Sequence, residues 1–131
     1  MRAAAWYGPG DVRVEEREEP RLVSERDAIV RVTTASICGT DLHVYRGDLT
    51  VVPGTVLGHE FMGVVERVGR DVRRFREGDR VVVSAWVADG ECWYCERQLY
   101  TQCETVNIFG MGPVYGESLD GAFAELVLSL I

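Results

Sequence analysis

Short hydrophobic runs, several of them β-branched or alternating with polar residues, recur along the chain. They lie at 12–14, 28–32, 61–68 and 81–83, and Gly, Pro and Asp residues separate them. Such runs are typical of β-strands, and their order favours a small β-barrel or sandwich over alternating helices and strands. The apolar residues 126–131 predict a further strand.

A single helix start interrupts this pattern. Thr40 and Asp41 follow Cys38 and Gly39, and either side chain can cap a helical turn over residues 42–45. The chain contains no internal repeat, low-complexity tract or linker. We therefore expect a mainly β domain with few helices.

Length and charge narrow the class of protein. With 131 residues, of which 47% are hydrophobic, the chain can form one domain with a real core. Its 21 acidic and 14 basic residues give a net charge of -7, which repels phosphate backbones and anionic lipids. We therefore expect no nucleic-acid and no membrane partner. Neither a signal peptide nor an apolar stretch of about 20 residues is present, so a cytoplasmic location is the default expectation.

The densest group of metal-binding residue types lies in the second half of the chain. Asp89, Cys92, Cys95 and Cys103 supply one carboxylate and three thiolates, and Gly90 suits a sharp reversal within the group. Four such ligands can enclose zinc tetrahedrally with no position left for water, which predicts a structural site. The alternatives are a disulfide with a spare thiol, a thioredoxin-like CxxC pair and ordinary buried cysteines. A redox CxxC is disfavoured because the strand-then-helix context is missing.

A second set of ligand types lies upstream. Cys38 and His59 come from separate segments and can share a zinc with a further protein ligand and an open position for substrate, as catalytic sites require. Thr40, Asp41 and Glu60 flank them and can form hydrogen bonds around the site. A lone His59 would more often be a structural histidine, but the presence of these other candidate residues favours a metal site.

Together these residues resemble the zinc-containing medium-chain alcohol dehydrogenases. The resemblance rests on the motifs at 38–43 and 58–63, the cysteine group and residues 120–125. Its wording is closest to the formaldehyde-dehydrogenase-like and threonine-dehydrogenase-like branches. It implies a GroES-like β-barrel domain over 1–131 with a short zinc-binding lobe at about 86–109. It also implies a Rossmann nucleotide-binding domain that is absent from this chain.

The resemblance assigns zinc ligands residue by residue. It implies a catalytic zinc held by Cys38 and His59, with Glu60 able to approach the metal and a third ligand beyond residue 131. Asp41 would orient His59 through its other ring nitrogen. The lobe departs from the family pattern at Asp89, where a cysteine is usual, and a hard oxygen ligand among sulfurs should weaken that site.

The resemblance also implies how the proton and the cofactor are handled. Thr40 would hydrogen-bond the substrate alcohol and begin a proton relay that His43 passes to solvent. NAD or NADP would bind to the missing domain, and this chain contributes no cofactor-binding residue. Gly110, Met111 and Gly112 are followed by Tyr115 where a dinucleotide fingerprint needs a third glycine, so that segment is interpreted as a loop.

The resulting hypothesis is an NAD(P)-dependent oxidoreductase domain, in which zinc polarises a small alcohol or aldehyde for hydride transfer. A homo-oligomer is compatible with it. The 131-residue chain alone is expected to hold one zinc tightly in the lobe and to lack activity. A non-catalytic zinc-binding domain or scaffold is the main alternative, and a GroES-like co-chaperonin subunit is a weaker one. Trp86 and Phe109 are expected either to line a substrate pocket or to fill the core.

Overall fold

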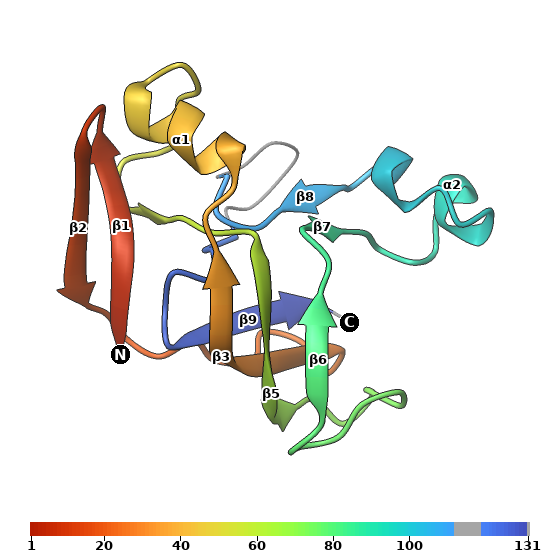
Figure 1. Cartoon of the computed structure of the whole chain (residues 1–131). Helices are drawn as coiled ribbons and strands as arrows, with labels where there is room; N and C mark the ends of the chain where they lie inside the picture. Colours follow the sequence, from red (N-terminus) through yellow and green to blue (C-terminus); the bar gives the residue numbers. More distant parts are fainter. Residues whose placement is uncertain (112–118, 131) are drawn as a thin grey trace.

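The chain folds into a strand-rich body from which one small lobe projects (Figure 1). The computed structural model describes residues 1–111 and 119–130. The strands are β1 (Arg2–Gly8), β2 (Asp11–Glu16), β3 (Asp27–Ser36), β4 (Thr55–Val56), β5 (Glu60–Val68), β6 (Arg80–Val83), β7 (Trp86–Val87), β8 (Asn107–Ile108) and β9 (Leu126–Leu130). The helices are α1 (Gly39–Arg46), α2 (Trp93–Glu96) and the 3-10 helix η1 (Tyr100–Gln102). The predicted mainly β fold with few helices is confirmed.

The strands pair in three antiparallel sheets. Their orders are β2-β1-β4, β6-β5-β3-β9 and β7-β8. The longest pairing joins β3 to β5, and it ends with Ser36 opposite Glu60. Because one strand continues into Cys38 and the other follows His59, this register brings the two predicted ligand segments to the same end of the sheet.

An apolar core lies between the strands of the body. Phe61 and Val65 of β5 are buried while Glu66 and Arg67, further along the strand, are exposed. Phe109 is fully buried and meets the Phe61 ring edge-on at 5.3 Å between centroids. Edge-to-face pairs of this kind add to the stability that burial supplies. Phe109 therefore belongs to the core, which was one of the two roles predicted for it.

Trp86 behaves differently from Phe109. Its side chain is 43% exposed at the start of β7, and it borders a shallow apolar cavity together with Phe75 and Val81. The segment from β7 to β8 then projects away from the sheets (Figure 1), as expected for the lobe at 86–109.

Helix α1 begins near the predicted helix start. The helix begins at Gly39, with Cys38 as its N-cap residue, a little before the predicted turn over residues 42–45. Of the two predicted capping side chains, that of Asp41 caps the helix. It lies in the first turn, where its carboxylate accepts the Cys38 backbone N–H at 2.8 Å and satisfies one of the free donors of the helix start. The predicted loop residues Gly112, Pro113 and Tyr115, and the strand residue Ile131, lie outside the described residues.

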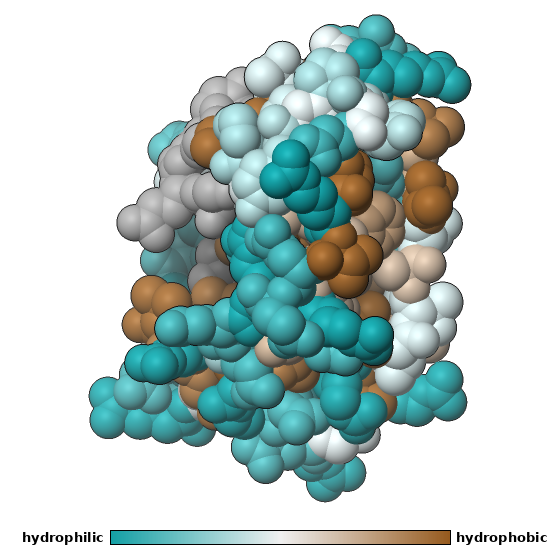
Figure 2. Space-filling view, turned by 90° about the vertical axis from the view of Figure 1, so that its left-hand side faces the viewer, coloured by the Kyte–Doolittle hydropathy of each residue, from teal (hydrophilic) through white to brown (hydrophobic). Residues whose placement is uncertain are grey.

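The outer surface is mostly polar. The side of the molecule that carries β2 is largely hydrophilic, with isolated hydrophobic side chains (Figure 2). Val12 and Val14 of β2 are exposed. Isolated apolar residues on a polar face do not indicate a binding site. Within the described part of the chain, no helix combines the length and hydrophobicity needed to cross a membrane.

Candidate metal centres

The first centre lies where β3, α1 and β5 meet. Cys38 caps α1, His59 immediately precedes β5 and Glu60 is the first residue of that strand. Their candidate ligand atoms all lie within 4.8 Å of one another, although Cys38 and His59 are far apart in the sequence. His59 is buried, Cys38 is half-buried and Glu60 is exposed, so the group faces solvent on one side.

Asp41 provides a test of whether this group suits a metal. Its Oδ1 lies 3.6 Å from Nδ1 of His59, and both atoms are buried without a hydrogen-bond partner among the described residues. Burying a polar atom without a hydrogen-bond partner costs free energy, so we expect these two atoms to approach within hydrogen-bond distance when the site is complete. An imidazole that binds a metal through one nitrogen usually donates its other N–H to a carboxylate. The donor set and these two atoms therefore fit a zinc ion at this position.

A junction of backbone segments holds His59 in place. Ala122 N–H donates to the Gly58 carbonyl at 2.9 Å, and Phe123 N–H donates to the Leu57 carbonyl at 2.9 Å. Gly121 packs so closely that a Cβ there would lie 2.3 Å from the Gly58 oxygen. The sequence analysis identified 120–125 as a family motif but missed this packing role.

The predicted relay residues lie on α1. The Thr40 hydroxyl is 3.7 Å from the Cys38 sulfur, which places it beside a candidate metal ligand. His43 follows three residues later, a spacing that brings two side chains to the same face of a helix. Its side chain is 57% exposed, and its Nδ1 lies 3.0 Å from Asp48 Oδ2. The sequence analysis did not single out Asp48.

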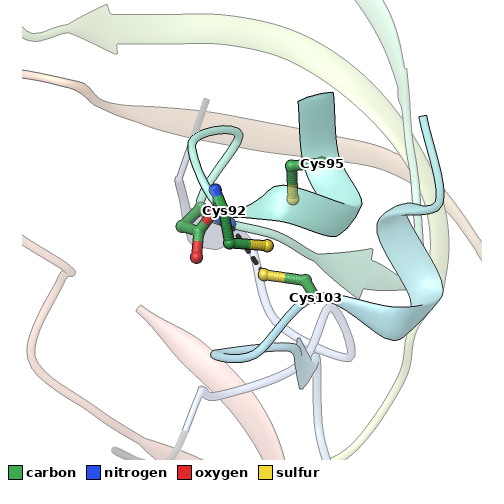
Figure 3. Close-up of side chains that lie close together, drawn as sticks. Cys92, Cys95 and Cys103 are labelled. Carbon is green, nitrogen blue, oxygen red and sulfur yellow. Dashed lines mark hydrogen bonds between the residues drawn. The ribbon is translucent and has the colours of Figure 1, made fainter. Parts of the chain in front are cut away.

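The second centre is the cysteine lobe. Figure 3 shows Cys92, Cys95 and Cys103 converging from the two sides of the lobe, and their ligand atoms, with that of Asp89, lie within 4.8 Å of one another. All four cysteines of the chain are free thiols, so the disulfide alternative is not realised. No other group of this kind occurs among residues 1–111 and 119–130.

Protons on these thiols compete with a metal. Burial, reinforced by a hydrogen bond with Cys92, raises the pKa of Cys95 to about 12. Hydrogen bonds from backbone groups, that of Glu104 first, lower the pKa of Cys92. Zinc binds thiolates, so its affinity for this cluster should rise with pH as the protons leave.

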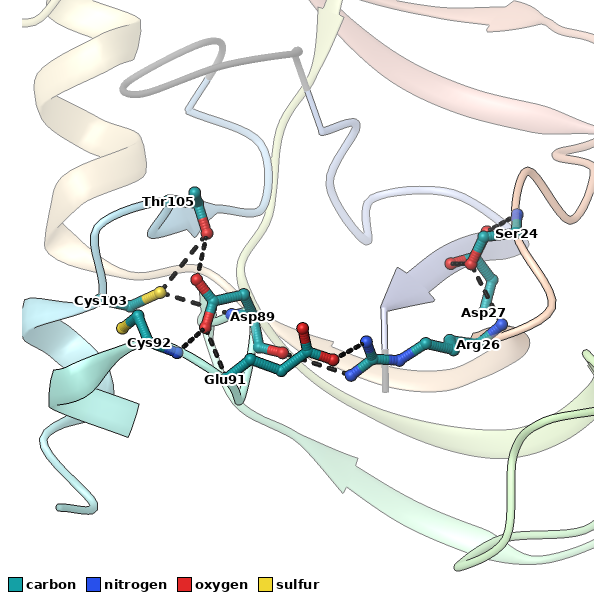
Figure 4. A network of polar contacts seen from close by, with 8 residues as sticks. All are labelled: Ser24, Arg26, Asp27, Asp89, Glu91, Cys92, Cys103 and Thr105. Atoms are coloured by element: carbon teal, nitrogen blue, oxygen red, sulfur yellow. Dashed lines mark hydrogen bonds and ion pairs between the residues drawn. The ribbon is translucent and has the colours of Figure 1, made fainter. Parts of the chain in front are cut away.

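Asp89 is held by several hydrogen bonds before any metal arrives (Figure 4). Its Oδ1 accepts the backbone N–H groups of Glu91 at 2.7 Å and Cys92 at 2.9 Å, and its Oδ2 accepts the Thr105 hydroxyl at 2.9 Å. The two backbone hydrogen bonds are the main reason that its pKa lies well below the usual range of a carboxyl group. The carboxylate is thus ionised and oriented, as a ligand must be.

Arg26 connects the lobe to the body of the domain. Its guanidinium pairs with the Glu91 carboxylate and donates to the Asp89 carbonyl at 3.3 Å (Figure 4). Gly90, between these two residues, has a φ of 77°, which confirms the sharp reversal predicted there. The ion pair is exposed, so it contributes little to stability.

Replacing Thr105 by valine should weaken zinc binding by the lobe. Valine has nearly the shape of threonine but cannot donate to Asp89 Oδ2, so the carboxylate loses one of the contacts that orient it. Loss of such an outer contact typically lowers metal affinity about tenfold to a hundredfold. Competition with a chromogenic chelator measures the affinity. Thr105→Ser is the matched control and should bind zinc as the parent does; equal affinity of Thr105→Val and the parent would contradict the role of Thr105.

Comparison with known proteins adds three findings. Residues 24–129 match the family model described as the alcohol dehydrogenase GroES-like domain. Zinc-type alcohol dehydrogenase B of Aspergillus flavus is 40% identical over 97% of this chain and 28% of its own length. Glutathione-independent formaldehyde dehydrogenase of Pseudomonas aeruginosa is 38% identical over 88% of this chain and 30% of its own length.

The solved structures agree with these sequence matches. The alcohol dehydrogenase TADH from Thermus sp. ATN1 superposes with a TM-score of 0.94 at 45% identity and covers 99% of this chain. The chain in turn covers 37% of that protein. The chain therefore spans about a third of the length of the proteins that it matches.

Proposed function

This chain belongs to the family of alcohol dehydrogenase GroES-like domains, and from that premise we propose that it is the zinc- and substrate-binding domain of an NAD(P)-dependent alcohol or aldehyde oxidoreductase. The observation that carries the proposal is the convergence of Cys38, His59 and Glu60 within 4.8 Å, beside the buried Asp41 carboxylate. This group combines a soft thiolate, an imidazole and an exposed carboxylate, which is the donor chemistry of an open zinc site.

In the proposed reaction the substrate hydroxyl gives up a proton to the relay and its carbon passes a hydride to NAD or NADP, which leaves a carbonyl product. Zinc, when bound at this centre, supplies a Lewis acid that makes the hydroxyl more acidic. Thr40 would accept the hydroxyl proton in a hydrogen bond, and its contact with Cys38 supports this role. His43 would receive that proton and release it to water, which its exposed side chain on the same face of α1 supports. Asp41 orients His59 through Nδ1.

The lobe has a structural task in this proposal. Its four candidate ligands are enough to complete a tetrahedral zinc shell, which would leave no open position on the metal for a substrate. We assign residues 1–131 to one domain and expect nicotinamide binding, and a third ligand for the first zinc, in parts of the protein that this chain does not include. A small alcohol or aldehyde is the proposed substrate.

The test uses the complete reading frame that encodes this chain. Reduction of NAD and NADP is measured with a series of alcohols and with formaldehyde. Cys38→Ser should lower the rate by about a thousandfold, since metal polarisation contributes several kcal/mol to such reactions. Asp71→Ala, in an exposed loop, is the control and should keep the parent's rate. Zinc binding without any alcohol or aldehyde turnover would sink the proposal and favour a non-catalytic zinc-binding domain.

A further inference from the structure

The end of helix α1 folds back onto one of its own side chains. Gly47 adopts the left-handed conformation with a φ of 86°, and its N–H donates to the Val44 carbonyl at 3.1 Å. Asp48 N–H then donates to the carbonyl of His43 at 2.9 Å. This pair of hydrogen bonds is the Schellman arrangement, which caps a helix and fixes the residue that follows the glycine.

The neighbouring turn secures this helix end. Gly10 N–H, in the turn between β1 and β2, donates to the Tyr45 carbonyl at 2.7 Å. A Cβ on Gly47 would lie 2.7 Å from Cγ of Pro9, so the helix end and the turn are in close contact. The backbone of Asp48 is therefore held by the helix cap, which in turn packs against the turn between β1 and β2.

Asp48 and His43, already joined by a backbone hydrogen bond, are also in contact through their side chains. Nδ1 of His43 lies 3.0 Å from Oδ2 of Asp48. An ionised carboxylate only accepts hydrogen bonds, so the nitrogen that faces it must carry the proton. A neutral imidazole has one N–H, and its other nitrogen is then a free acceptor.

We propose that Asp48 is a positioning residue that holds the neutral His43 ring with its proton on Nδ1 and so leaves Nε2 as the proton acceptor. The inference rests on the proposed function for its purpose, because His43 is the exit of the proton relay there. Nε2 takes the incoming proton, the resulting imidazolium keeps its Nδ1–H hydrogen bond to Asp48, and the Nε2 proton passes to water. One ring nitrogen thus receives every proton, and the ring does not have to turn.

The placement can be tested without zinc, substrate or cofactor. The chain contains two histidines, so nitrogen-15 NMR of the ring nitrogens, with His43→Gln to assign the signals, identifies the tautomer of each. In the parent, the ratio of Nδ1–H to Nε2–H should be higher for His43 than for a free histidine side chain. In Asp48→Ala the ratio of Nδ1–H to Nε2–H should fall by up to about fivefold, the range for an exposed charged pair. Asp48→Glu should restore part of the preference.

Two comparisons decide the outcome. Asp71→Ala removes an equally exposed carboxylate far from either histidine in the sequence and should leave the His43 tautomer unchanged. An unchanged tautomer ratio in Asp48→Ala, or a parent ratio of Nδ1–H to Nε2–H no higher than that of a free histidine side chain, would overturn the inference. In the complete protein, Asp48→Ala should lower the oxidation rate at saturating alcohol with little change in KM, and an unchanged rate would contradict the relay role. Absence of all turnover would count against the proposed function alone, because the tautomer measurement stands without it.

Discussion

A chain that carries Cys103→Ser is expected to lose its tightly held zinc, whereas Cys38→Ser is expected to keep it. Cys103 is one of four candidate lobe ligands, is buried, and accepts the Asp89 backbone N–H at 3.4 Å. A serine hydroxyl stays protonated at neutral pH and is a poor zinc ligand. Structural zinc contributes about 10–16 kcal/mol through four ligands, so one ligand corresponds to about 3 kcal/mol, or about a hundredfold in affinity.

The lobe should also loosen when the metal is lost. Its apolar cluster consists of Cys95, Cys103 and Val106, with Ala88 and Cys92 packed against it. Such a small core cannot offset the conformational entropy of the segment between β7 and β8, so the metal has to supply the difference. Limited proteolysis of the purified proteins should therefore cut Cys103→Ser within the lobe and leave Cys38→Ser intact there.

Elemental analysis of the purified chain gives the zinc content directly. The parent and Cys38→Ser should each retain about one zinc per chain, because the lobe offers four candidate ligands and the first centre offers three, of which Glu60 is exposed. The reverse result, with zinc lost from Cys38→Ser and kept by Cys103→Ser, would exchange the structural and catalytic assignments of the two centres.

Most of what the sequence predicted has a local signal, whereas the grouping of Cys38 with His59 came from their residue types and from the family resemblance. Asp89, Cys92 and Cys95 follow one another at short steps, and a segment with this spacing brings its ligands together whatever the rest of the chain does. Strands β2, β3, β5, β6 and β9 and helix α1 were predicted for the same reason, since hydrophobic alternation and a turn signal each act over a few residues. The short strands β4, β7 and β8 carry too few residues to show such a pattern. The cap of α1 is also a local signal, because the Asp41 carboxylate reaches back to the Cys38 backbone N–H from within the first turn.

The parts that were missed depend on contacts between distant segments. Thr105 reaches Asp89 across 16 residues, and Arg26 reaches Glu91 across 65. The residue type alone does not predict either contact, because threonine and arginine occur at many kinds of position on protein surfaces. Asp48 is only five residues from His43, yet the contact requires the left-handed turn at Gly47, whose consequence for the side chains becomes visible in three dimensions.

The junction at Gly121 is another distant contact, and replacing this glycine by alanine is expected to damage the first metal centre and the fold together. A Cβ at this position would lie 2.3 Å from the Gly58 oxygen and 2.4 Å from the Leu57 oxygen. Both contacts are with backbone, which cannot turn aside as a side chain can. The segment would have to separate from residues 57–58 and weaken the hydrogen bond from Gly121 N–H to the Val56 carbonyl, now 2.8 Å long.

Because residues 57–58 directly precede His59, this separation should move the imidazole away from Cys38. Overpacking of this kind costs about 1–3 kcal/mol, which lowers the melting temperature of a domain of this size by about 5–10 °C. Thermal unfolding followed by circular dichroism measures the first effect. NMR during a zinc titration measures the second, since His59 signals should respond to zinc in the parent and not in Gly121→Ala. Gly8→Ala, where a Cβ meets no atom within 4 Å, is the matched control and should behave as the parent does. If Gly121→Ala has the same melting temperature as Gly8→Ala and its His59 signals still respond to zinc, the junction does not position this centre.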